Sequence, residues 1–390
     1  MRNAPRSVTI TQAMHGRLPL TAQTHRRLVV KVGSAVLSGP QGRQHQLAIA
    51  AQVAALRAEG REVVLVSSGA QATGMQKLGL TEKPKSMPGK QALAAVGQPT
   101  LMLLWEQAFS WYDLKVAQVL LTAEDLAHRH RYLNARQTLE TLLEWGIVPI
   151  INENDTVMVE EIKFGDNDQL SALIASLVGA DLLILLSDIE ALYEADPRTH
   201  PEAQPIPYVE RVDAGVLRMA GDSPNRVGTG GMKSKLLAAE KAQAAGIPHL
   251  LLPGTRPQSI AEALQGAPVG TLFAGGQRRY SGRKLWLYQL PKPQGEVVVD
   301  AGAAKALRQG GASLLPAGIL EVRGQFGVGE AVRCLDEQGN LIGVGLVNYS
   351  AAELARIKRR KTREIEALLG YKNTDEAIHR DYFALASELE

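Results

Sequence analysis

From residue 28 onward, short continuous apolar runs alternate with stretches in which apolar residues recur at helical spacing. Buried strands are predicted at 28–32, 62–68, 115–121, 147–151, 181–187 and 247–253. Helices are predicted at 46–60, 91–110, 169–179 and 230–246, and another after a capping-box pair, Thr122 and Asp125, ending near Gly146. Apolar strands separated by helices are typical of a mainly parallel sheet covered on both faces. The pattern predicts an α/β protein, an αβα sandwich, over 28–290.

The pattern changes after the segment PKPQG (291–295), which we interpret as a linker. Short β-rich runs then alternate with glycine turns, and DEQGN (336–340) has the composition of a hairpin loop. We therefore expect a small β-rich domain at 295–370. The polar end, 371–390, is expected to be a frayed tail.

The composition excludes some classes of protein and of site but does not indicate a function. A chain of 390 residues favours two domains, and a net charge of +3 does not indicate a nucleic-acid binder. One cysteine, Cys334, excludes an internal disulfide and a thiolate metal cluster, which fits a reducing cytoplasm. No run is long and apolar enough for a membrane span, so we expect no membrane partner. Residues 1–27 contain five arginines and no acid; transit peptides share that composition, but we interpret them as a disordered basic tail.

The unusual polar segments all follow predicted strands. In parallel sheets, ligands bind at the carboxyl ends of the strands. Five loops are therefore expected on one edge of the sheet: 31–34, 67–69, 152–168, 187–198 and the approach to 228–235.

The segment Gly228–Lys235 opens a predicted helix with three glycines and two lysines. Glycines let backbone amides converge, and a helix N-terminus favours an anion. Lysines in a first turn oppose their own helix dipole, which indicates a bound anion such as a nucleotide phosphate. The spacing is not that of a Walker A loop. A solvated lysine pair after a flexible turn is the alternative.

The segment 152–168 (NENDTVMVEEIKFGDND) holds two clusters of Asn and Asp around a predicted hairpin. Aspartate binds an ammonium group and asparagine amides bind a carboxylate, so such clusters suit a zwitterion. They also suit Mg²⁺, although the EF-hand spacing is absent. A pair of Asx turns would explain the same residues structurally.

Lys31 lies inside an apolar strand, where an ammonium group is costly without a partner. Lys31 and Lys235 could hold opposite sides of a transferring phosphoryl group, with Asp168 between them to orient both. Phosphoryl transfer needs positioning and charge neutralisation more than a covalent nucleophile. No G-x-S-x-G motif supports hydrolase chemistry.

With these residues assembled, the chain resembles the amino-acid kinase family, and within it the glutamate 5-kinases of the long bacterial type. The resemblance runs from residue 28 to about 370, through KVGSAVL, VSSGA, AAVGQ, LNAR, INENDTV, GDNDQLSAL, LYEADPR and GTGGMKSK. The last β-rich part resembles a PUA domain through VDAGAAKAL and GASLLPAGI.

The resemblance implies transfer of the γ-phosphoryl group of ATP, with Mg²⁺, to the side-chain carboxylate of L-glutamate, the first step of proline biosynthesis. It implies catalytic roles for Lys31, Lys235 and Asp168. By the same resemblance, the residues near glutamate are Ser68, Asp155, Asn167, Asn152 and Asp166. The nucleotide-binding residues are Lys31, Ser187, Asp188, Thr229, Gly230, Gly231, Met232, Lys233, Ser234 and Lys235. Ser187 and Ser234 stand where the family usually has threonine, which keeps the hydroxyl group.

The resemblance also implies partners and leaves rivals open. It implies feedback inhibition by proline near 152–168, a homo-oligomer (dimer or tetramer), and glutamyl phosphate reductase as a downstream partner. Another amino-acid kinase, for acetylglutamate or carbamate, is a rival within the same fold. An RNA-binding protein is a rival of another class, because PUA domains often bind RNA and 356–363 is basic; a solvated helix face is the alternative for that segment.

Overall fold

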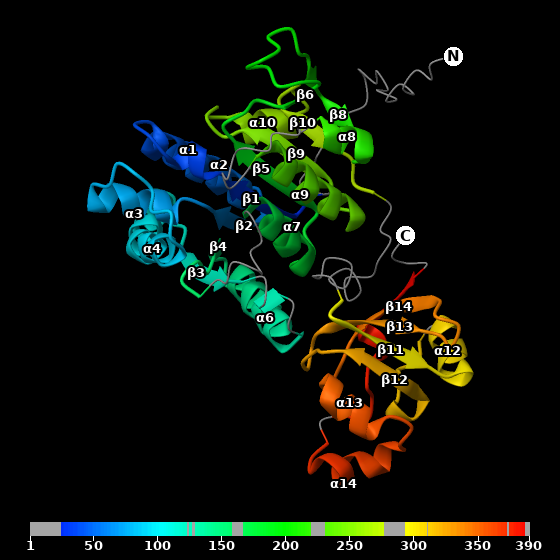
Figure 1. Cartoon of the computed structure of the whole chain (residues 1–390). Helices are drawn as coiled ribbons and strands as arrows, with labels where there is room; N and C mark the ends of the chain where they lie inside the picture. Colours follow the sequence, from blue (N-terminus) through cyan, green and yellow to red (C-terminus); the bar gives the residue numbers. More distant parts are fainter. Residues whose placement is uncertain are drawn as a thin grey trace, which may run out of the picture. The chain divides into compact units, whose positions relative to one another are not determined.

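The computed structural model describes residues 25–122, 125–126, 129–157, 167–219, 231–276, 293–309, 311–372 and 374–386. It contains two compact units, the first built mainly from 25–122 and 134–276, the second mainly from 293–386 (Figure 1). None of the described helices is both long enough and apolar enough to cross a bilayer.

The first unit is built on an eight-stranded sheet in the order β3-β4-β2-β1-β5-β9-β10-β8. The strands are β1 (Arg27–Val32), β2 (Glu62–Ser67), β3 (Val116–Leu121), β4 (Val148–Glu153), β5 (Leu182–Ser187), β8 (Tyr208–Val209), β9 (His249–Pro253) and β10 (Thr271–Phe273). From β3 to β9 every neighbouring pair is parallel, and β10 runs antiparallel to β9. A separate hairpin joins β6 (Leu192–Tyr193) to β7 (Pro205–Ile206). The mainly parallel sheet is the one that the apolar runs predicted.

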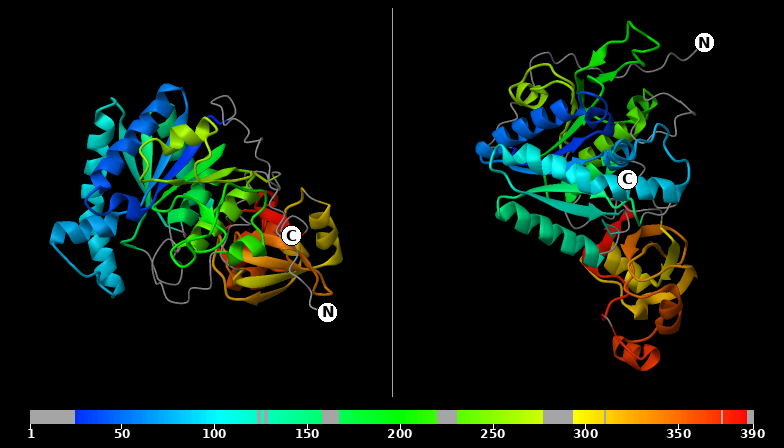
Figure 2. Two further views of the ribbon diagram at one scale, coloured as in Figure 1. Left: turned by 90° about the horizontal axis from the view of Figure 1, so that it is seen from above. Right: turned by 90° about the vertical axis from the view of Figure 1, so that its left-hand side faces the viewer.

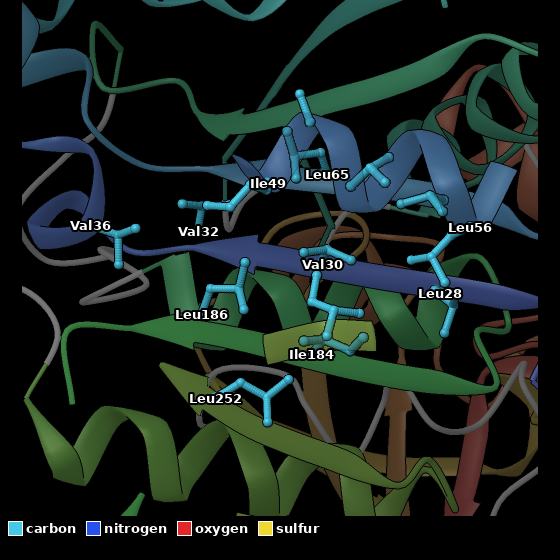
Figure 3. Close-up of a cluster of buried hydrophobic side chains, with 14 of the residues drawn as sticks. Leu28, Val30, Val32, Val36, Ile49, Leu56, Leu65, Ile184, Leu186 and Leu252 are labelled. Carbon is cyan, nitrogen blue, oxygen red and sulfur yellow. The ribbon is translucent and has the colours of Figure 1, made fainter. Parts of the chain in front are cut away.

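Helices cover both faces of this sheet (Figures 1 and 2). They are α1 (Ser34–Leu37), α2 (Gly42–Ala58), α3 (Ala70–Leu78), α4 (Met87–Ser110), α6 (Arg129–Glu144), α7 (Asn167–Leu177), α8 (Ala214–Arg218), α9 (Met232–Ala244) and α10 (Ser259–Leu264). Residues of α2, α4 and α10 form one core with the alternate β1 residues Leu28, Val30 and Val32 (Figure 3). Helices α7 and α9 pack on each other, and α7 also packs on β1. Because strand side chains alternate between faces, Lys31 lies on the face opposite to Val30 and Val32.

Helix α3 was not predicted from the sequence. It begins after Gly69, whose φ is +112°, and contains Gly74, so its helical propensity is low. Close backbone contact with α4 supports it: a Cβ atom on Gly74 would lie 2.1 Å from the Leu93 carbonyl oxygen, and one on Gly97 would lie 1.8 Å from that of Ala70. Tertiary packing therefore forms a helix that local sequence does not favour.

The second unit contains a five-stranded sheet in the order β12-β11-β13-β14-β15. Its strands are β11 (Gly295–Val299), β12 (Ile319–Gly324), β13 (Ala331–Leu335), β14 (Leu341–Leu346) and β15 (Phe383–Leu385), and its helices are α12 (Ala301–Arg308), α13 (Ala351–Ile357) and α14 (Ile365–Leu369). Asp336 to Asn340 form the turn between β13 and β14, as the sequence predicted. Burial raises the pKa of the Cys334 thiol to about 12, so this cysteine is a core residue of β13.

The prediction that 371–390 is a frayed tail was wrong for much of this segment. Strand β15 pairs antiparallel with β14, and Ile378 bridges to Leu314. Ala377, Ile378 and Phe383 are buried in the core of this unit. The segment is polar overall, but its few apolar side chains complete a core that 295–370 leaves open.

The basic segment 356–363 is also not a helix face. Helix α13 ends at Ile357, and Arg359 has a positive φ of 61°. A short 3₁₀ turn follows at Thr362–Glu364. Most of these basic side chains are exposed, so they are solvated around a helix end rather than along one.

Candidate active site

The carboxyl ends of β1, β2, β4 and β5 surround a cavity of about 380 Å³. Its lining is mostly polar and small: Lys31, Gly33, Ser34, Ala35, Ser38, Ser68, Gly69, Ala70, Gln71, Ala72, Met75, Lys83, Asn152, Glu153, Asp155, Asn167, Ser187, Asp188 and Lys235. Strand β1 has β2 on one side and β5 on the other, so the chain reverses its direction of winding beside this cavity. Such switch points are where α/β sheets bind ligands.

Two lysines meet on one aspartate at the base of the site. The Nζ atom of Lys31 donates to Oδ1 of Asp168, and Nζ of Lys235 donates to Oδ2 at 3.1 Å. Asp168 has no exposed surface, and the two lysines are 2% and 6% exposed. Two buried ammonium groups thus share one buried carboxylate.

The chain positions these three groups by simple local rules. Lys31 reaches the α7 face of the sheet because strand side chains alternate. Asp168 lies in the first turn of α7, where the helix dipole favours a carboxylate. Lys235 lies in the first turn of α9, where the dipole disfavours a cation, and Asp168 offsets that repulsion.

Amide side chains form a second polar group in the wall. Asn167 donates from Nδ2 to the Ser68 hydroxyl and to Oδ1 of Asn152, both at 2.8 Å. Asn152 donates from Nδ2 to Oε1 of Gln98 at 2.8 Å. The carboxylate of Asp155 accepts from Nε2 of Gln71 at 3.1 Å. Ser187 donates its hydroxyl to Oδ1 of the neighbouring Asp188 at 3.0 Å.

The structure gathers most of the residues predicted for the site. The ones that line the cavity are Lys31, Ser68, Asn152, Asp155, Asn167, Ser187, Asp188 and Lys235, with Asp168 buried behind them. Gly231, Met232, Lys233 and Ser234 form the start of α9 but are not in the cavity lining. Asp166, Thr229 and Gly230 lie outside the described residues.

Other wall residues were missed. Gln71 follows the predicted Ser-Gly-Ala loop, and Lys83 lies between α3 and α4. Glu153 ends β4 and is 7% exposed, inside the Asn/Asp cluster that the sequence did mark. A glutamine in a helix has no unusual energetic cost, so only the contacts of Gln71 in the structure identify it as a site residue. A glutamate at the end of an apolar strand does have such a cost, so Glu153 could have been predicted from the sequence.

Within the described ranges, no three histidine, cysteine, aspartate or glutamate side chains are grouped so as to hold a metal ion. Mg²⁺ is commonly bound by one or two carboxylates together with substrate phosphates, without an all-protein cage. The carboxylate of Asp188 in the cavity lining fits a metal that arrives on a nucleotide.

The chain is similar to known protein families and proteins over most of its length. The profile of the "Amino acid kinase family" matches residues 26–252, and that of the "PUA domain" matches 295–369. Glutamate 5-kinase of Thermus thermophilus is 62% identical over 93% of this chain and 98% of its own length. Glutamate 5-kinase of Geobacter sulfurreducens is 52% identical over 91% and 96%.

Two solved structures also match. UMP kinase from Bacillus anthracis has a TM-score of 0.45 at 15% identity, covering 65% of this chain and 97% of its own. Carbamate kinase from Giardia lamblia bound to AMP-PNP has a TM-score of 0.47 at 17% identity, covering 64% and 98%. The profile match and the high identity to these two glutamate 5-kinases, over nearly all of both chains, show that this chain belongs to the amino acid kinase family.

Proposed function

We propose that this protein transfers the γ-phosphoryl group of ATP to the side-chain carboxylate of L-glutamate, forming L-glutamyl 5-phosphate, the first step of proline biosynthesis. The observation that carries the proposal is the buried Lys31–Asp168–Lys235 group at the cavity base. The glutamate 5-kinase relatives, at up to 62% identity, give the acceptor.

The two lysines do the chemical work in this proposal. A glutamate side-chain carboxylate is already a nucleophile at neutral pH, so no general base is needed. One of its oxygens forms a bond to the γ-phosphorus while the bond from that phosphorus to the ADP oxygen breaks. Lys31 and Lys235 stabilise the negative charge on the transferring group, and Asp168 keeps both ammonium groups in place without solvent reorganisation.

The acceptor binds at the amide-rich wall. Asp155 and the carbonyl oxygen of Asn167 suit an ammonium group, and the Ser68 hydroxyl suits a carboxylate. Asn152 fixes Asn167 by a hydrogen bond of 2.8 Å. Asp166 belongs to the same sequence cluster and is assigned to this side of the site.

The donor binds toward the ends of β5 and α9. Ser187 and Asp188 follow β5, and the loop Thr229–Lys235 leads into α9, whose N-terminus favours phosphate. Mg²⁺ bound to the nucleotide supplies further charge neutralisation at the phosphates.

Three finer assignments belong to the same proposal. Proline, also a zwitterion, competes at the groups that hold the glutamate ammonium and carboxylate. A homo-oligomer, a dimer or a tetramer, is part of the proposal as what the family resemblance implies. We place the enzyme in the cytoplasm, where a glutamyl phosphate reductase consumes the unstable acyl phosphate.

Hydroxylamine trapping tests the function directly. The protein is incubated with ATP, Mg²⁺ and either glutamate, aspartate, acetylglutamate or carbamate. We expect ADP from glutamate alone, with matching hydroxamate, since hydroxylamine captures acyl phosphates. Turnover with carbamate or acetylglutamate but not glutamate would overturn the proposed acceptor.

A further inference from the structure

We propose that Gln98 is a positioning residue that helps to fix the amide direction of Asn152, and through it that of Asn167, and thereby keeps a carbonyl oxygen of Asn167 available for the substrate ammonium group. Gln98 lies on α4, is 9% exposed and is not in the lining of the 380 Å³ cavity. It touches the site through Asn152. The inference rests on the proposed function and specifies how the amino acid is recognised.

The direction of the network follows from one backbone group. The N–H of Glu153 donates to the side chain of Asn152 at 2.9 Å. A backbone N–H is only a donor, so the atom that it contacts must be the Asn152 oxygen, Oδ1. The other end of that amide is therefore the NH₂ group.

This NH₂ group faces Gln98, so the facing atom of Gln98 must be an oxygen. The observed contact is from Asn152 Nδ2 to Gln98 Oε1, at 2.8 Å. If the Gln98 amide turned over, two NH₂ groups would face each other. Both groups are buried, and an unmatched buried donor costs free energy.

The same logic fixes Asn167. Oδ1 of Asn152 accepts a second hydrogen bond, at 2.8 Å, so the contacting atom of Asn167 must be Nδ2. The Asn167 NH₂ group also donates a hydrogen bond to the Ser68 hydroxyl oxygen. The opposite atom, Oδ1 of Asn167, is buried and has no hydrogen-bond partner in the part of the chain that the structure describes.

An acceptor oxygen in a cavity wall selects a donor, and an ammonium group is the donor that an amino-acid substrate offers. The Asp155 carboxylate lines the same cavity and supplies the opposite charge. The two acceptors distinguish glutamate from an otherwise similar dicarboxylate without the amino group.

The support for Gln98 is rigid backbone contact. Gly97, the preceding residue, packs so closely on α3 that a Cβ atom would lie 1.8 Å from the Ala70 carbonyl oxygen. The residue after Ala70 is Gln71, which holds Asp155. One contact between α3 and α4 thus places both glutamines that orient acceptor-binding side chains.

The test compares glutamate with glutarate, which lacks the amino group, as substrate or competing ligand. Gln98→Met keeps the length of the side chain and removes the acceptor. Gln98→Glu keeps an oxygen for Asn152. Gln118→Met is the matched control, because Gln118 borders the neighbouring cavity on β3 but makes no contact in this network.

We expect Gln98→Met to lower kcat/KM for glutamate about tenfold or more, mainly through KM, because the buried NH₂ group of Asn152 then loses its acceptor and the amides of Asn152 and Asn167 are held less firmly. Glutarate binding and the KM for ATP should change less than about twofold, since neither uses this oxygen. Gln98→Glu should keep most of the preference for glutamate over glutarate, and Gln118→Met all of it.

Equal losses for glutamate and glutarate would overturn the inference, as would an unchanged preference in Gln98→Met. If Gln98→Met does not fold, Gln98→Glu decides: a retained preference supports the role of the oxygen, and a lost one contradicts it. Absence of glutamate turnover in the unaltered protein would instead reject the proposed function.

Discussion

Asp168 holds two lysine side chains in place at the base of the candidate active site. A buried carboxylate is costly alone, and it is retained here between two ammonium groups. The sequence marked Lys31 because a charge inside an apolar strand needs a partner. The sequence also predicted that Asp168 lies between Lys31 and Lys235, which is more than two hundred residues after Lys31. The packing of α7 on α9 is what brings Lys235 to the other oxygen of the same carboxylate.

Replacing Lys31 should separate catalysis from folding. In Lys31→Met, Asp168 keeps its ion pair with Lys235, so the chain should still fold, although with reduced stability. We expect kcat to fall at least about a hundredfold, because one group that stabilises the transferring phosphoryl is lost.

Hydroxamate formation and a thermal melt measure both effects of this change. The exposed Lys305 on α12 offers a control, and Lys305→Met should leave both quantities unaltered. Turnover of Lys31→Met within a few-fold of the unaltered protein would remove Lys31 from the catalytic group.

His249 should give the first unit a pH-dependent stability. It is 1% exposed, packs edge-on against Phe273 at 5.2 Å, and neither ring nitrogen has a hydrogen-bond partner among the described residues. Burial lowers the pKa of His249 from 6.5 to about 3. Below pH 6.5 the unfolded chain therefore binds a proton that the folded chain excludes, and stability falls until about pH 3.

Between pH 7.5 and pH 5, this residue should reduce the free energy of unfolding by about 2 kcal/mol, from about 1.4 kcal/mol per pH unit below 6.5. Urea denaturation of the unaltered protein and of His249→Leu at the two values measures it. The variant should lose that part of the difference and be no less stable at pH 5. An identical pH dependence in both proteins would show that His249 does not carry it.

At the scale of elements, the apolar runs predicted the parallel strands well because their burial on both faces leaves a clear pattern. Helices α1, α3, α8 and α10 and the short strands β6, β7, β8 and β10 were not predicted. Strands of two or three residues are too short to show periodicity, and α3 depends on glycine contacts with α4 that local propensity cannot reveal. The second Asn/Asp cluster of 152–168 was expected in a loop, but its last two residues, Asn167 and Asp168, lie in the first turn of α7.

The α3–α4 contact gives a prediction for this scale. In Gly97→Ala, the new methyl group would lie 1.8 Å from the Ala70 carbonyl oxygen. That oxygen belongs to the backbone of α3, so no flexible side chain can move aside to relieve the clash. We expect a loss of about 1–3 kcal/mol in the free energy of unfolding, even though alanine favours helices.

A raised KM for glutamate should accompany that loss, because Gln71 and Gln98 move with the two helices. Denaturant titration and steady-state kinetics measure the two effects. Gly327→Ala is the control, since its methyl group would come no closer than 3.9 Å to a neighbour. A Gly97→Ala protein as stable as this control would mean that the helices can separate at no cost.

At the scale of the whole molecule, the described residues form two compact units, and each unit has a hydrophobic core of its own. The change of pattern near 291–295 predicted a domain boundary there, and this stays a prediction because 277–292 lie outside the described residues. The sequence misplaced the end of the second unit, because a polar segment with few apolar residues resembles a tail. Those few side chains are the ones that the core uses.

Ending the chain at two different points should show what the last residues do. A chain that stops after Gly370 loses β15 and the buried side chains of Ile378 and Phe383. Burial of two such side chains is worth about 3–6 kcal/mol, which is comparable with the stability of a small domain. We expect the second unit to lose its cooperative unfolding transition, whereas a chain that stops after Ala386 should keep it.

The first unit has a separate core and sheet, so hydroxamate formation from glutamate should persist in both chains. Calorimetry and the trapping assay would decide: a second transition that survives truncation at Gly370 would make 371–386 dispensable, and loss of turnover together with that transition would show that the catalytic unit depends on the second.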